Sequence, residues 1–133
     1  MTNTVFEKMN SITRYSGTVV KGLQNGRAFG FPTANIKLSA GYREPEQGVF
    51  AVLVECQGEK YQGMLYVGNR PTIHLSELSI EIHIFDFNKM IYGEHVIFEI
   101  VKKIRDEQHF PSIDTLIAQI KKDKDEIVRF FNA

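Results

Sequence analysis

The segment Gly30-Phe31-Pro32-Thr33-Ala34-Asn35 contains the residue types with the greatest chemical capacity in this chain. Thr33 and Asn35 are neutral oxygen donors separated by one residue, so on an extended segment both side chains point to the same face. Two such oxygens could meet one hard cation, and Mg²⁺ carrying nucleotide phosphates is the obvious candidate. An equally open interpretation is a turn rich in glycine and proline, capped by small polar residues.

The glycines that precede this segment suit an anion site. They are Gly17, Gly22 and Gly26. Glycine lets main-chain N–H groups approach an anion closely. The common phosphate fingerprints, Gly-x-x-x-x-Gly-Lys-Ser/Thr and Gly-x-Gly-x-x-Gly after a strand, are both absent from the sequence. A phosphate site in this region therefore has to be of another kind.

Glu81 is a second residue with a candidate chemical role. It lies in a run in which isoleucines alternate with Glu81 and His83, which is the pattern of a half-buried strand. From the sequence alone, a lone glutamate in that polar register usually faces solvent, and His83 on the same face either lines a site or is exposed. The four histidines, His74, His83, His95 and His109, lack the paired spacing of a zinc site.

The elements that must position these residues are mostly strands. Six short runs have β-type composition: 15–21, 31–38, 49–56, 60–67, 79–87 and 95–104. No long helix interrupts them, which favours antiparallel pairing. We therefore predict a mainly β fold, a six-stranded antiparallel closed barrel that leaves no exposed sheet edge.

The end of the chain changes to helical periodicity. The residues at helical spacing are Leu116, Ile117, Ile120, Lys124, Ile127, Val128 and Phe131, and Lys124 is the polar one. Ser112 or Asp114 could cap this helix. We expect the amphipathic helix to pack on the barrel, either as scaffold alone or with its first turn walling a ligand pocket.

Composition bounds the class of protein. The chain has 133 residues, which suits one domain, and 16 basic residues balance 16 acidic ones, which disfavours a general nucleic-acid binder. The single cysteine, Cys56, permits no internal disulfide, which fits a cytoplasmic protein. We expect Cys56 to be buried, because it lies in an apolar run. No apolar run approaches a membrane span, and no signal peptide is recognised. Residues 1–14 are predicted to be a flexible lead-in.

Several motifs occur in the order in which the riboflavin kinase (flavokinase) family carries them, from about Tyr15 to the end of the chain. They are Val19-Val20-Lys21-Gly22, Gly26-Arg27, the Pro-Thr-Ala-Asn segment at 32–35, Gly68-Asn69-Arg70-Pro71-Thr72, the run 81–87, Tyr92-Gly93 and Ile104-Arg105-Asp106-Glu107 with Phe110. The chain resembles the C-terminal kinase domain of bifunctional bacterial riboflavin kinase/FAD synthetases, with residues 15–133 as that domain.

The resemblance implies an ATP:riboflavin 5′-phosphotransferase that gives FMN and ADP. Glu81 falls where the family carries its catalytic glutamate, and Thr33 and Asn35 fall where it meets Mg²⁺. The implied ATP-binding residues are Gly22, Arg27, Thr33, Ile84, Asp86 and Tyr92. The implied flavin-binding residues are Arg105, Gln108 and Phe110. The expected partners are riboflavin or FMN and ATP or ADP, with no nucleic acid and no membrane.

Two positions depart from the family pattern. Tyr66 stands where an asparagine is usual, and Gln108 where a lysine is often found. Two other functions stay open: a non-catalytic flavin- or nucleotide-binding regulatory module, and a small barrel for single-stranded nucleic acid. A nucleotidyltransferase domain does not fit before Tyr15, so we expect either a stand-alone kinase or an excised domain of an FAD synthetase.

Overall fold

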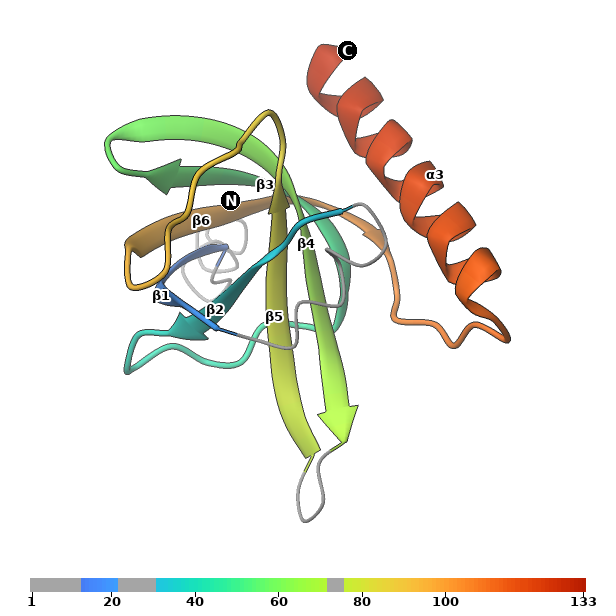
Figure 1. Cartoon of the computed structure of the whole chain (residues 1–133), viewed down its shortest axis with the longest axis horizontal. Helices are drawn as coiled ribbons and strands as arrows, with labels where there is room; N and C mark the ends of the chain where they lie inside the picture. Colours follow the sequence, from blue (N-terminus) through green and yellow to red (C-terminus); the bar gives the residue numbers. More distant parts are fainter. Residues whose placement is uncertain (1–12, 22–30, 72–75) are drawn as a thin grey trace, which may run out of the picture.

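The computed structural model describes residues 13–21, 31–71 and 76–133 (Figure 1). Most of the predicted lead-in, together with Gly22, Arg27 and His74, lies outside these ranges. The strands are β1 (Arg14–Val20), β2 (Ala34–Leu38), β3 (Gly48–Cys56), β4 (Glu59–Pro71), β5 (Ser76–Ile84) and β6 (His95–Arg105). The helix is α3 (Ile113–Asn132).

The strands form a closed barrel in the order β1-β2-β5-β4-β3-β6, with antiparallel pairing throughout. This confirms the predicted fold. The strand ends differ from the prediction in places. Strand β2 begins at Ala34 rather than at Phe31, because Pro32 has no N–H to contribute to a ladder. Strands β4 and β5 pair as far as Pro71 and Ser76, and they project beyond the barrel as a two-stranded ribbon (Figure 1).

Strand β5 also ends earlier than predicted, at Ile84 instead of Phe87. The chain turns after Phe85, and Asp86 adopts a left-handed conformation with φ of 54°. Aspartate tolerates this region better than most residues because its short side chain can hydrogen-bond locally. The turn carries the following segment toward the end of the barrel that holds Thr33 and Ile84.

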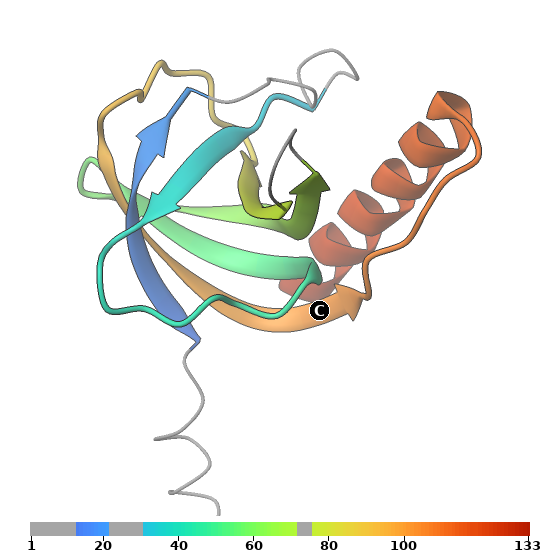
Figure 2. The same cartoon turned by 90° about the horizontal axis from the view of Figure 1, so that it is seen from below.

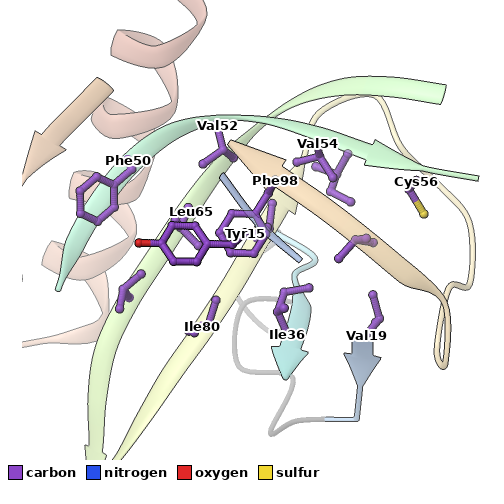
Figure 3. Close-up of a cluster of buried hydrophobic side chains, with 14 of the residues drawn as sticks. Tyr15, Val19, Ile36, Phe50, Val52, Val54, Cys56, Leu65, Ile80 and Phe98 are labelled. Carbon is purple, nitrogen blue, oxygen red and sulfur yellow. The ribbon is translucent and has the colours of Figure 1, made fainter. Parts of the chain in front are cut away.

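The barrel interior is filled by apolar side chains from all six strands (Figure 3). Tyr15 stacks on Phe98, with the ring centroids 5.3 Å apart. Cys56 is buried in the same interior, as predicted. On β5 the inward side chains are Ile80, Ile82 and Ile84. Side chains alternate along a strand, so Glu81 and His83 must lie on the outer face.

Helix α3 lies beside the barrel (Figures 1 and 2). Ser112 caps its first turn through a reciprocal pair of hydrogen bonds with Thr115, so Ser112 and not Asp114 is the cap. The helix packs Ile127, with Ile120 and Phe131, in a second apolar cluster that includes Val49 and Ala51. No helix in the described ranges is long and apolar enough to cross a membrane.

Candidate active site

One row of residues crosses five strands of the barrel at the same level. The strand register pairs Asn35 with Glu81, Glu81 with Tyr66, Tyr66 with Val49, and Val49 with Arg105. Tyr66 and Val49 pack in the outer cluster with α3, so this row belongs to the outer face. Neighbouring strands lie about 4.8 Å apart, and four such steps give the row a length of roughly 19 Å. Glu81 therefore lies between Asn35 at one end and Arg105 at the other.

The carboxylate of Glu81 is held by two hydroxyl groups. Thr33 Oγ1 donates to Oε1 at 3.0 Å, and Ser79 Oγ donates to Oε2 at 3.1 Å. A hydroxyl has one hydrogen and two lone pairs, so Thr33 keeps its lone pairs for another partner while it holds Glu81. Asn35 is buried directly across the strand pair from Glu81. The structure thus brings together Asn35 of β2, Thr33 just before it, and Glu81 of β5.

A cavity of about 190 Å³ opens beside Thr33. Its lining comes from β1, from the start of β2 and the residues before it, from β5 and from the segment after β5: Val19, Pro32, Thr33, Ala34, Ile82, Ile84, Phe87, Asn88, Lys89, Met90, Ile91 and Tyr92. Three of the predicted ATP-binding residues, Thr33, Ile84 and Tyr92, are in this lining, whereas Asp86 is exposed and is not. Lys21 lies over the ring of Tyr92, with Nζ 5.9 Å from the centroid. The cavity lining combines apolar side chains with the polar side chains of Thr33, Asn88, Lys89 and Tyr92.

Arg105, at the other end of the row, is held by Asp123 and Phe110. Its Nε lies 3.0 Å from both carboxylate oxygens of Asp123, and Nη2 lies 2.9 Å from Oδ2. The guanidinium carbon lies 5.5 Å from the ring centroid of Phe110. Gly48 has φ of 146°, and a Cβ there would lie 2.6 Å from the Arg105 carbonyl oxygen, so glycine permits this close approach of β3 to β6.

Tyr66 connects Glu81 with the segment that follows β6. Its hydroxyl donates to Glu107 Oε1 at 2.8 Å. Burial, this hydrogen bond, and the negative charges of Glu107 and Glu81 raise the pKa of Tyr66, and Arg105 partly opposes them. The phenol lies over Gly68, where any side chain would collide with the ring. Tyr66 therefore occupies the outer face between the two ends of the row.

The remaining predicted flavin-side residues lie in the segment between β6 and α3. Phe110 is half-buried against Arg105, while Gln108 is exposed. Cation-binding clusters of three or more histidine, cysteine, aspartate or glutamate side chains are absent from the residues that the structure describes. The oxygen donors around Glu81 come instead from threonine, serine and asparagine neighbours.

Sequence reasoning missed several of these residues. Asp123 is 2% exposed although it is charged, and Gln119 donates to its Oδ1 at 2.9 Å. A signal for it existed, because Asp123 falls three residues after Ile120 and four before Ile127, on the face that packs. The Tyr66–Glu107 hydrogen bond and the cavity lining from Phe87 to Ile91 had no comparable signal, because both depend on how the segments after β5 and β6 fold back.

Comparison with known proteins places this geometry in a family. The sequence model of Flavokinase, described as riboflavin kinase, matches residues 9–131. The chain is 43% identical over 119 residues to a bifunctional riboflavin kinase/FMN adenylyltransferase of Bacillus subtilis, covering 87% of this chain and 38% of that protein. It is also 42% identical over 113 residues to the RNA-binding riboflavin kinase RibR of the same organism, covering 84% of this chain and 48% of RibR.

Among solved structures, a Streptococcus pneumoniae chain described as a macrolide-efflux protein matches with a TM-score of 0.78 and 42% identity, over 84% of this chain and 37% of that one. The chain thus spans less than half of the length of each of these relatives. The family match covers almost all of the sequence and includes every residue of the row from Asn35 to Arg105. The resemblance seen in the motifs is confirmed, and the chain belongs to the riboflavin kinase family.

Proposed function

We propose that this chain transfers the γ-phosphate of ATP to the 5′-hydroxyl of riboflavin, giving FMN and ADP. The observation that carries the proposal is the cross-strand row in which Glu81 lies between Asn35 and Arg105. A group that orients an acceptor hydroxyl needs the phosphate donor on one side and the acceptor on the other. The row offers that order on one continuous face.

The nucleotide occupies the cavity beside Thr33 in this proposal. Ile84 and Tyr92 contact the adenine and ribose, and the phosphates extend toward Thr33 and Asn35. Lys21 lies close to Tyr92 and adds positive charge on that side of the proposed nucleotide site. Gly22, Arg27 and Asp86 keep the ATP-binding roles that the family resemblance gives them, and the first two lie outside the described residues.

The oxygen donors at Thr33 and Asn35 fit Mg²⁺. Mg²⁺ prefers oxygen ligands and is usually held by few protein groups together with phosphates and water. Thr33 Oγ1 donates its hydrogen to Glu81, so its lone pairs are available to a cation. When bound with ATP, Mg²⁺ would neutralise charge on the phosphates. The residues themselves bind the nucleotide and fix its last phosphate beside Glu81.

Glu81 acts as the base that orients the riboflavin 5′-hydroxyl and accepts its proton. Phosphoryl transfer depends more on alignment and charge neutralisation than on strong activation of the nucleophile. The two hydroxyl donors on Glu81 fix the carboxylate in one orientation, which suits the alignment of an acceptor. Arg105 and Phe110 form the flavin side, where an arginine plane or an aromatic ring can cover the isoalloxazine. Gln108, in the same segment, keeps its proposed role of hydrogen-bonding the edge of the flavin ring.

The test is formation of FMN. The protein is incubated with riboflavin, ATP and MgCl₂, and the flavins are separated by chromatography, with parallel reactions that lack ATP or contain EDTA. FMN should form in the complete reaction and not in the two controls. Riboflavin binding, followed by fluorescence, without FMN would instead favour the non-catalytic binding module. A gel-shift assay with RNA tests the expectation of no nucleic-acid partner, which stays a prediction, as does a cytoplasmic location.

A further inference from the structure

Lys124 of α3 is surrounded by aromatic groups of the barrel. Its Nζ lies 3.3 Å from His83 Nε2, 5.2 Å from the ring centroid of Phe85 and 6.0 Å from that of Phe31. The lysine is half-buried on the face of α3 that packs against the barrel. A cation over aromatic faces is attracted by the ring quadrupoles. These contacts explain why a lysine is found among the apolar residues of this helix face.

His83 connects this lysine to the backbone before Thr33. Its Nδ1 donates to the Pro32 carbonyl at 2.8 Å, so Nε2 of the neutral ring accepts from Lys124. The ring is buried and makes edge contacts with Phe31 and Phe85, at centroid distances of 5.6 Å and 5.5 Å. Lys124, His83 and Pro32 thus form a continuous polar path from the helix to the entry of β2.

The hydrogen bond from His83 connects β5 to the chain just before the point where the β2–β5 ladder begins. The register between β2 and β5 ends with Ala34 opposite Ile82. Pro32 has no N–H, so the chain before Ala34 cannot continue as a regular ladder strand. His83 is two residues after Glu81 on the same outer face of β5. The strand that carries Glu81 therefore also carries the group that anchors the residue preceding Thr33.

We propose that His83 and Lys124 are positioning residues that hold the Pro32–Thr33 backbone at its distance from Glu81, so that helix α3 takes part in phosphate transfer. This inference rests on the proposed function, because it assigns the pair to the alignment of Thr33 and Glu81. His83 acts directly on Pro32, and Lys124 acts through His83. The acceptor side of the row is held by other contacts, because Arg105 pairs with Asp123 and lies over the ring of Phe110.

Lys124→Met tests the contribution of the helix, and Lys122→Met is its matched control. Methionine keeps the length and apolar character of the stem and removes the charge. Lys122 is exposed on the same helix. Lys124→Met should raise the KM for MgATP and lower kcat, by about tenfold in kcat/KM, since a small displacement of a reacting group has a large kinetic cost. The KM for riboflavin should not change, and Lys122→Met should match wild type in every parameter.

Two substitutions of His83 separate its two contacts. Asparagine places an amide N–H near the position of Nδ1, so His83→Asn keeps the donor to Pro32 and loses the contact with Lys124. Glutamine places its amide near Nε2, so His83→Gln keeps a partner for Lys124 and loses the donor to Pro32. His83→Gln should show the larger loss of kcat/KM for MgATP. His83→Asn should resemble Lys124→Met, and combining these two should add no further loss, as expected for residues in one path.

A readout without turnover separates this inference from the proposed function. Hydrogen–deuterium exchange of a peptide covering residues 31–38 should be faster in Lys124→Met and His83→Gln than in wild type and Lys122→Met. If wild type makes no FMN, the proposed function fails, and the exchange difference still decides whether the pair holds this segment. If Lys124→Met matches Lys122→Met in exchange and kinetics, or changes the KM of both substrates equally, the positioning role is wrong.

Discussion

The hydroxyl of Thr33 donates a 3.0 Å hydrogen bond to Glu81, although 48 residues separate the two in sequence. The same carboxylate accepts from Ser79 through its other oxygen. Thr33 also lines the cavity in which we propose that the nucleotide binds, so one side chain touches both the cavity and the carboxylate. The distance between Thr33 and Glu81 is therefore the dimension on which phosphate transfer would depend.

Replacing Glu81 with glutamine should nearly abolish turnover while both substrates still bind. The amide keeps the size of the side chain but cannot accept the hydroxyl proton, and loss of a general base typically costs about 10²- to 10⁴-fold in rate. The measurement is kcat for FMN formation, with riboflavin binding followed by fluorescence. Glu59→Gln, the same change at the exposed first residue of β4, is the control, and equal rates for the two variants would remove Glu81 from the role of base.

Thr33→Val should weaken the nucleotide side of the site. Valine has nearly the shape of threonine but cannot hydrogen-bond Glu81 or offer oxygen to a cation, and losing a hydrogen bond to a charged group corresponds to about 10- to 100-fold in kcat/KM. Thr33→Ser keeps the hydroxyl and should restore most of the activity. Steady-state kinetics with MgATP varied checks both variants. If Thr33→Ser loses as much activity as Thr33→Val, retaining the hydroxyl does not preserve activity, and the role given to this oxygen is contradicted.

Asp123→Asn should destabilise the protein strongly. Asp123 is buried and holds Arg105, which is itself only 15% exposed by its side chain. Removing one partner of a buried ion pair leaves an uncompensated charge, with a typical loss of about 3–5 kcal/mol in the free energy of unfolding. Urea titration gives that quantity. Asp125→Asn, at an exposed position of the same helix, should have little effect, and similar losses for both variants would refute the assignment.

Tyr66→Phe should change riboflavin recognition more than stability. The substitution keeps the ring over Gly68 and removes only the hydrogen bond to Glu107. Glu107 belongs to the segment with Arg105 and Phe110, so we expect the KM for riboflavin to rise by about three- to tenfold, the range of one ordinary hydrogen bond. The KM for MgATP should stay constant. A rise in the KM for MgATP alone would place the Tyr66 hydroxyl on the nucleotide side.

His83 should make stability depend on pH. Burial lowers the pKa of His83, the hydrogen bond to Pro32 opposes this, and the positive charge of Lys124 adds to the lowering. Above about pH 6.5 the ring is neutral in both the folded and unfolded states. As pH falls below that value, the unfolded chain takes up a proton first, so the free energy of unfolding decreases until pH passes the lower folded pKa.

The measurement is urea unfolding of wild type and His83→Asn between pH 8 and pH 5. Asparagine does not titrate, so the stability advantage of wild type over the variant should shrink as pH falls. His95→Asn, at an exposed position, controls for loss of a histidine elsewhere. A stability difference between wild type and His83→Asn that is constant across this range would contradict the prediction.

Much of the fold followed from local pattern. The alternation of isoleucines around Glu81 predicted both a strand and its outward glutamate, because side chains alternate strictly along β-structure. The helical spacing that ends at Phe131 predicted α3, and Ser112 was one of two predicted caps. The strand ends were less well predicted: β2 was placed too early at Phe31, and β5 was extended past Ile84 into the turn at Asp86. The residue composition of a strand does not predict the residue at which its hydrogen-bonded pairing with the neighbouring strand ends.

The sequence by itself determined the strand and helix periods and, through ordered motifs, the family, and it indicated the residues for which we propose chemical roles. Tertiary structure decided which of these residues meet. Asn35, Glu81, Tyr66, Val49 and Arg105 align only because the barrel order brings β2, β5, β4, β3 and β6 side by side in one register. The contacts of Asp123 and Lys124 likewise require the helix to dock on the outer face. Periodicity is a property of neighbours along the chain, whereas register and docking are set by packing between distant segments.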